Sequence, residues 1–242
     1  MNIDVYAVCW NESFLMPYFM RHYKTFARNI FIYDNYSTDG CDHIAEGMGA
    51  RVIYFGNDNL DDREYLKVKN NAWKGTDADW IICCDLDEFI YHPDLVSELT
   101  KLQAGGVTLP NIEGYNVYSE SLPTGLHRYG GQIYDSIDTG FPSTDFTKQI
   151  IFNPKIREID YAYGCHENTA KGIRGGKIYM IHYRCIGGVE SMISRHKMYA
   201  ARMSRFNKTR NLGVHYLRSE SEIRNDWSEN IKKAEKLLFL QR

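Results

Sequence analysis

The first hundred residues alternate short apolar runs with longer segments whose apolar positions recur at helical spacing. The apolar runs predict strands, and the segments between them predict helices that begin at cap-type residues or proline. This alternation predicts an α/β fold, a doubly wound, mostly parallel sheet flanked by helices. The predicted strands are residues 3–9, 30–33, 51–55 and 80–84, and the predicted helices end near residues 26, 47, 74 and 103.

The fourth predicted strand, which begins at Trp80, ends in the acidic residues Asp85, Asp87 and Glu88. Its apolar part lacks polar alternation, as in a parallel strand that is covered on both faces. In an extended chain Asp85 and Asp87 point the same way, and ligands of α/β sheets bind at the carboxyl ends of the strands. The pair predicts a site for Mn²⁺ or Mg²⁺ and a nucleotide diphosphate, with a solvated turn as the alternative.

The alternation of predicted strands and helices ends after Gly106. Residues 114–144 carry short β-like pieces between glycines and turn formers, including Pro123-Thr124-Gly125 and Gly130-Gly131. A region of this kind is expected to bind an acceptor substrate. Residues 148–152 and 177–184 predict two further strands.

Helical spacing returns in the last part of the chain. Apolar residues recur from 189 to 203, and a final helix is predicted from Ser219, where Glu222 completes a capping-box pattern, to about Leu238. Its apolar stripe is Ile223, Trp227, Ile231, Ala234 and Leu238, and it is expected to pack against the domain or a second subunit. We expect a catalytic domain over residues 1–186, with a nucleotide-binding half at 1–110 and an acceptor-binding half at 111–186. A helical extension over 187–242 is expected to follow.

Composition narrows the class of protein. The 242 residues are 43% hydrophobic and 25% charged, which is ordinary for a globular enzyme. The net charge of −2 gives no overall attraction to nucleic acid, so no nucleic-acid partner is expected. Six cysteines without a C-x-x-C pair predict reduced thiols. No secretory signal or membrane-spanning run is seen, so a cytoplasmic location is expected.

Three motifs carry a resemblance to a known family. The sequences Val8-Cys9-Trp10-Asn11-Glu12, Tyr33-Asp34-Asn35-Tyr36-Ser37-Thr38-Asp39 and Asp85-Leu86-Asp87-Glu88-Phe89 resemble, in order and spacing, the nucleotide-sugar signatures of family 2 type glycosyltransferases with the GT-A fold. The resemblance implies donor contacts from the first two motifs and metal binding by the third. The implied donor-binding residues are Cys9, Asn11, Glu12, Asp34, Asn35, Asp85 and Leu86, and the implied metal ligands are Asp85 and Asp87.

The helix predicted over residues 62–74 has a basic side. In the resembling enzymes this helix brings a basic or amide side chain over the donor, which makes Lys69 and Asn70 the candidates here. A solvated charged face is the alternative.

Two late segments add histidines. Tyr163-Gly164-Cys165-His166-Glu167 and His182-Tyr183-Arg184 resemble elements of a subset of family 2 and of family 92 like transferases. The resemblance implies a histidine ligand for the metal, with His182 as first choice and His166 as second. A purely structural histidine is the alternative.

An inverting transfer needs a carboxylate close to the acceptor hydroxyl. Asp145 and Asp138 are the acids best placed in the sequence for this role, with Asp145 favoured because the family's catalytic acid usually precedes the next strand. A role in loop turns is the alternative for both.

Residues 191–219 contain no acid and carry seven basic residues: Arg195, Lys197, Arg202, Arg205, Lys208, Arg210 and Arg218. One face of this segment is expected to pack on the domain while the basic face is exposed. That face is either simply solvated or attracted to anionic lipid headgroups, which would hold the enzyme at the inner face of the membrane.

We therefore expect a metal-dependent glycosyltransferase of hexosyltransferase type. It would move a sugar from a UDP-linked donor to a glycan or lipid-linked acceptor in surface polysaccharide synthesis. A nucleotidyltransferase is one alternative, although such enzymes carry a Gly-rich basic loop after the first strand, where this chain has Asn11-Glu12-Ser13. A non-catalytic carbohydrate-binding module is the other.

Overall fold

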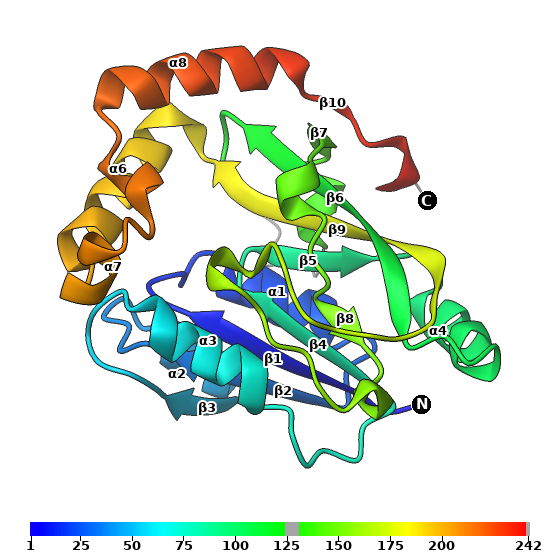
Figure 1. The fold of residues 1–242 in the computed structure, drawn as a ribbon. Coiled ribbons are helices and arrows are strands. Elements are labelled where there is room, and N and C mark those ends of the chain that lie inside the picture. Colours follow the sequence, from blue (N-terminus) through cyan, green and yellow to red (C-terminus); the bar gives the residue numbers. More distant parts are fainter. Residues whose placement is uncertain (124–130, 241–242) are drawn as a thin grey trace.

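A computed structural model describes residues 1–123 and 131–240 of the chain (Figure 1). Its first sheet has the strand order β3-β2-β1-β4-β8, which is parallel except for β8. The strands are β1 (Ile3–Cys9), β2 (Asn29–Asp34), β3 (Arg51–Tyr54), β4 (Trp80–Asp85) and β8 (Ile151–Phe152). The predicted α/β fold with a mostly parallel sheet is confirmed.

Helices cover both faces of this sheet. On one face, α1 (Met16–Tyr23) and α2 (Cys41–Gly47) pack against the alternate β1 side chains that include Val5. On the other face, Tyr6 and its neighbours pack below the end of α3 (Asp62–Asn71). Asp61 caps α3 by accepting a hydrogen bond from the backbone N–H of Arg63. The doubly wound arrangement follows from strands that are apolar on both faces.

A second sheet has the order β10-β7-β6-β9-β5, in which only β6 and β9 pair in parallel. Its strands are β5 (Glu88–Tyr91), β6 (Leu109–Ser119), β7 (Thr139–Pro142), β9 (Arg174–Ile186) and β10 (Glu235–Lys236), and α4 (Leu95–Ala104) follows β5. The predicted strand from Trp80 is confirmed as β4, but the expectation that Asp85 and Asp87 lie in one extended segment is wrong. The chain turns at Leu86 and Asp87, and Glu88 starts a strand of the other sheet.

Helix α1 lies between the two sheets and joins them. The ring of Phe19 meets that of Phe89 on β5 edge to face at 5.8 Å, and the hydroxyl of Tyr23 donates to the backbone carbonyl of Glu88 over 2.9 Å. Both sheets therefore share one apolar core. This shared core fixes the turn at Leu86 and Asp87 relative to β9.

The C-terminal helices α6 (Gly188–Arg202), α7 (Arg205–Thr209) and α8 (Glu220–Asn230) follow β9 and arch over one end of the molecule (Figure 1). The capping box of Ser219 and Glu222 is confirmed. The predicted continuation of this helix to Leu238 is wrong, because the chain after α8 forms short 3₁₀ turns and β10, and Leu238 is 71% exposed.

In the described part of the chain, no helix is both long enough and apolar enough to cross a membrane. The turns predicted at Thr124-Gly125 and at Gly130 lie outside the described residues.

Candidate functional site

The carboxyl ends of β1, β2 and β4 bring the three motifs to one edge of the first sheet. The parallel register aligns Cys9 with Asp34, and Val8 with Asp85. Residues from distant parts of the sequence therefore meet where α/β sheets bind their ligands.

Asn11 joins the loop after β1 to the loop after β2. Its backbone N–H donates to Oγ of Ser37 over 2.9 Å, and its Oδ1 accepts from the backbone N–H of Thr38 over 2.7 Å. Oδ1 of Asp34 accepts from the backbone N–H of Ser37 over 2.7 Å, whereas its Oδ2 is buried without a partner in the described chain. Burial raises the pKa of the Asp34 carboxyl group. These bonds fix both loops at the sheet edge.

Asn35 is buried, and other parts of the protein engage both ends of its amide. Nδ2 donates to two backbone carbonyl oxygens at 3.0 and 2.8 Å, and Oδ1 accepts from the Tyr65 hydroxyl at 3.2 Å and from the Arg202 guanidinium. Cζ of Arg202 lies 3.8 Å from the centroid of the Trp10 ring. The end of α6 therefore covers the corner formed by the first two motifs.

Two predicted donor-site residues, Cys9 and Leu86, point into the interior. Sγ of Cys9 lies 2.8 Å from Sγ of Cys41, and Leu86 is buried in the main apolar core. Among the residues that the structure describes, three potential metal-ligand atoms converge at one place, Cys9, Asp34 and Cys41, where they lie within 4.8 Å of one another. Asp85, Asp87 and a late histidine do not form such a compact group.

Asp85, whose side chain is 35% exposed, belongs to a cluster of alternating charges whose other members are buried. Its Oδ1 lies 2.7 Å from Nζ of Lys69, and its Oδ2 lies 4.0 Å from Nζ of Lys148. Nζ of Lys148 also lies 2.8 Å from Oε1 of Glu88. Burial disfavours the charged form of Lys69, but the Asp85 carboxylate, together with Glu88 and two nearby thiols, raises the pKa of the ammonium group. The two lysines balance the two carboxylates inside the protein.

The neighbouring candidate Asn70 binds the protein as well, since its Oδ1 accepts from the backbone N–H of Tyr161 over 2.9 Å. In this structure the side chains of both Lys69 and Asn70 therefore hold α3 in place.

Asp87 faces β9. Its Oδ2 lies 3.5 Å from Nε2 of His182 and 3.6 Å from Nη1 of Arg184. Nδ1 of His182 donates to Oδ1 of Asn116 over 3.0 Å, and the Phe146 ring stacks on the imidazole at 3.8 Å. Burial lowers the pKa of His182 to about 4. The ring is therefore neutral at neutral pH, with its Nε2 lone pair towards Asp87.

Asp85 and Asp87 thus have different protein partners, although the sequence predicted one shared target. The turn at Leu86 and Asp87 is the physical reason, because the alternation of an extended strand ends there.

Arg184 extends this group towards the first motif. Its Nη1 lies 3.4 Å from Oε1 of Glu12 and 3.5 Å from the Tyr199 hydroxyl, and its Nη2 is buried without a partner in the described chain. Burial, together with the nearby Asp87 carboxylate, raises the pKa of Glu12 to about 7. Arg195 from α6 is also buried, and its Nε and Nη1 have no partner among the described residues. Buried unpaired guanidinium donors are suited to an anionic ligand.

The two predicted bases lie in different surroundings. Asp145 is exposed in a 3₁₀ turn next to Phe146, and its backbone carbonyl accepts from Nδ1 of His166 at 2.7 Å. Asp138 instead lies 3.4 Å from Nζ of Lys236, which is on the edge strand β10. Of the two carboxylates, Asp145 is thus attached to the segment that packs on His182.

The expectation that the basic residues of 191–219 form one exposed face is wrong for Arg195 and Arg202. The buried Arg195 donates to the backbone carbonyl of Ile186, and the buried guanidinium of Arg202 donates to Asn35. Sequence reasoning also gave no site role to Lys148 or Arg184. For Arg184 a signal was available, because it follows His182 by two positions on the same strand and therefore shares its face. For Lys148 no local pattern marks its pairing with Glu88.

No protein-family model and no curated protein matches this chain. Among solved structures, it is similar to glucosyl-3-phosphoglycerate synthase from Mycobacterium tuberculosis in complex with Mn²⁺ and UDP, with 19% identity over 47% of this chain and 44% of that one and a TM-score of 0.33. It is similar to S. aureus TarS, with 13% identity over 83% and 39% of the two chains and a TM-score of 0.45.

A third similar structure is mannosyl-3-phosphoglycerate synthase from Rubrobacter xylanophilus, with 16% identity over 47% and 40% of the two chains and a TM-score of 0.34. The chain spans less than half the length of each of these three proteins.

Proposed function

We propose that the protein is a metal-dependent glycosyltransferase. It moves a sugar from a UDP-linked donor to a hydroxyl group of an acceptor. The observation that carries the proposal is the facing pair of Asp87 and His182. A carboxylate oxygen and an imidazole nitrogen with a free lone pair lie 3.5 Å apart. Two electron-pair donors in this arrangement repel each other unless a cation lies between them.

A divalent cation fits the donor set. Mn²⁺ accepts both imidazole and carboxylate ligands, and Mg²⁺ binds through one or two carboxylates while substrate phosphates fill the remaining positions. Asp87 and His182 would hold the ion, and Asn116 would orient the imidazole. When bound, the cation stabilises the negative charge that develops on the departing diphosphate.

The surrounding residues are suited to the anionic half of the donor. Arg184 and Arg195 have buried N–H groups without partners in the described chain, so a diphosphate would replace missing hydrogen bonds rather than compete with existing ones. The corner built by Asn11, Asp34 and Asn35 would bind the nucleoside. The unpaired Oδ2 of Asp34 would accept a hydrogen bond from an N–H group of the base or from a hydroxyl group of the ribose.

The transfer itself requires a proton acceptor near the incoming hydroxyl. We assign this role to Asp145, which is exposed and precedes Phe146, the residue whose ring stacks on His182. The acceptor oxygen bonds to the anomeric carbon, the bond from that carbon to the diphosphate oxygen breaks, and the hydroxyl proton passes to the carboxylate. The electron pair of the broken bond leaves with the nucleoside diphosphate.

The first experiment is calorimetric titration with UDP, GDP and CDP, each with and without Mn²⁺. We expect one nucleotide to bind only with Mn²⁺, and Asp87→Asn to abolish that binding. Asp138→Asn is the matched control, since its carboxylate pairs with Lys236 on β10. Release of nucleoside diphosphate from a sugar donor would separate transfer from nucleotidyl transfer, which releases pyrophosphate. No nucleotide binding under any condition would overturn the proposal.

A further inference from the structure

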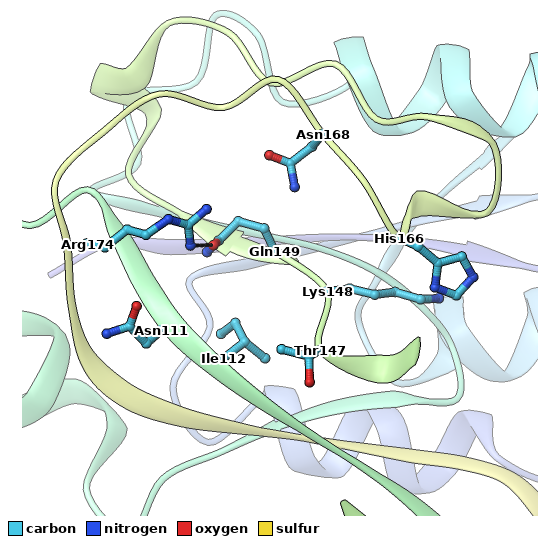
Figure 2. A pocket seen from close by; sticks show the side chains of 8 residues that line it. All are labelled: Asn111, Ile112, Thr147, Lys148, Gln149, His166, Asn168 and Arg174. Atoms are coloured by element: carbon cyan, nitrogen blue, oxygen red, sulfur yellow. Dashed lines mark hydrogen bonds between the residues drawn. The ribbon is translucent and has the colours of Figure 1, made fainter. Parts of the chain in front are cut away.

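A polar pocket of about 340 Å³ lies where the start of β6, the segment before β8 and the start of β9 meet (Figure 2). This volume is at the lower end of the range for small-molecule sites. All the lining side chains except Ile112 are polar. Besides Thr147 they are Asn111, Lys148, Gln149, His166, Asn168 and Arg174. None of the described lining residues is acidic.

Arg174 is held in place by a buried amide. Its Nη1 donates to Oε1 of Gln149 over 2.7 Å, and Nε2 of Gln149 donates to two backbone carbonyl oxygens at 3.1 and 2.8 Å (Figure 2). Among the described residues, the other guanidinium nitrogens of Arg174 have no hydrogen-bond partner. A preoriented guanidinium fork with free N–H groups matches the geometry of a phosphate group.

The opposite side of the pocket connects to the proposed reaction centre. His166 donates its Nδ1–H to the carbonyl of Asp145, because a carbonyl oxygen only accepts, so a neutral ring carries its lone pair on Nε2. Lys148 lines the pocket with its chain and reaches Glu88 and Asp85 with its ammonium group. A ligand in the pocket would therefore lie next to the proposed base and to the acidic end of β4.

We infer that this pocket binds the acceptor, and that the acceptor is a hydroxyl compound carrying a phosphate ester. The phosphate would pair with Arg174, while the amides of Asn111 and Asn168 would bind its polyol or sugar part, leaving one hydroxyl on the His166 side. This inference rests on the proposed glycosyltransferase function. The phosphate group of such an acceptor can belong either to a small phosphomonoester or to the phosphodiester unit of a polymer.

The test uses the full chain and three probes, glycerol 3-phosphate, a glycerol-phosphate oligomer and glycerol. Binding of each is measured by calorimetry, first without nucleotide and then with UDP and Mn²⁺. We expect one of the phosphorylated probes to bind and glycerol not to bind. Preference for the monoester or for the oligomer would identify the source of the phosphate.

The variant is Arg174→Gln, and Lys171→Gln is the control because Lys171 is exposed and does not line the pocket. Arg174→Gln is expected to weaken phosphate-probe binding by at least about 10-fold, since it removes a charged bidentate contact, and to leave UDP binding unchanged. Equal affinity of wild type and Arg174→Gln, or no binding of either phosphorylated probe, would overturn the inference. The titration without nucleotide tests the acceptor pocket alone. If the donor site were wrongly assigned, UDP would fail to bind, whereas binding of the phosphorylated probes would not be affected.

Discussion

Nε2 of His182 lies 3.5 Å from Oδ2 of Asp87, while Nδ1 of the same ring donates to Oδ1 of Asn116 over 3.0 Å. The hydrogen bond to Asn116 fixes the tautomer, and the tautomer decides whether Asp87 faces a lone pair or a proton. The buried Asn116 on β6 therefore determines whether Nε2 of His182 can bind a cation together with Asp87.

Asn116→Ala is expected to weaken Mn²⁺ binding by about 10- to 100-fold, the usual effect of removing an outer partner of a metal-binding histidine. Without Asn116 the proton is free to move to Nε2, where it would bond to Asp87 and block the ligand position. Free Mn²⁺ measured by electron paramagnetic resonance during titration checks this. Asn71→Ala is the control, because Asn71 is exposed on α3. Unchanged Mn²⁺ affinity in Asn116→Ala would contradict the assigned tautomer.

Glu88→Gln should destabilise the fold by about 3 kcal/mol, because it leaves a buried lysine without its close carboxylate. Glu88 is fully buried and accepts from Nζ of Lys148 over 2.8 Å. Urea unfolding measures the change in the free energy of unfolding. Glu190→Gln, which removes an exposed ion pair with Arg224, should change that free energy much less, because solvent screens the pair. Equal effects of the two variants would show that the buried cluster is not stabilising.

His22 should make the stability of the protein depend on pH. Its Nε2 bonds to the carbonyl of Ile90 over 2.8 Å, and burial lowers its pKa to about 4, whereas the unfolded chain takes up the proton near pH 6.5. The unfolded state therefore binds more protons between these values, so stability is lost as the pH falls from about 6.5 towards 4.

Between pH 7 and pH 5 this histidine is expected to contribute about 2 kcal/mol to the loss of stability. His22→Gln keeps a donor for the Ile90 carbonyl and removes the titration, so the difference between urea unfolding at the two pH values should shrink by that amount. His43→Gln is the control because the His43 side chain is 82% exposed. A pH dependence identical to wild type in His22→Gln would refute the assignment.

Gly114→Ala tests the support of the proposed catalytic segment. A Cβ at this position on β6 would clash with the backbone carbonyl of Phe146, whose ring stacks on His182. The 3₁₀ turn that carries Asp145 must then move, and we expect a loss of about 1–3 kcal/mol in stability together with weaker Mn²⁺ binding.

Gly47→Ala is the matched control. Gly47 is the last residue of α2, and a Cβ there would meet nothing within 4 Å. Thermal unfolding and the Mn²⁺ titration check both variants. Retained Mn²⁺ affinity in Gly114→Ala would show that the turn does not support the site.

The sequence alone determined the first sheet and the edge at which the motifs meet. Strands such as β1 are continuous apolar runs, and their ends are marked by cap and turn residues such as Asn11 and Asp34, so the information is local. In a parallel sheet the carboxyl ends of strands gather at one edge, and the meeting of Cys9 with Asp34 followed from this rule. The capping box at Ser219 was equally local.

Only the tertiary structure decided which side chains face one another. The strand β5 that follows the turn at Leu86 and Asp87 was not predicted, because it starts with the pairing of Glu88 with His182, which lies between distant parts of the chain. The same holds for Arg184 beside Glu12 and for Lys148 beside Glu88. Such contacts form because the two sheets share one core around α1. They join residues that are far apart in the sequence, so the pattern of a few neighbouring residues cannot predict them.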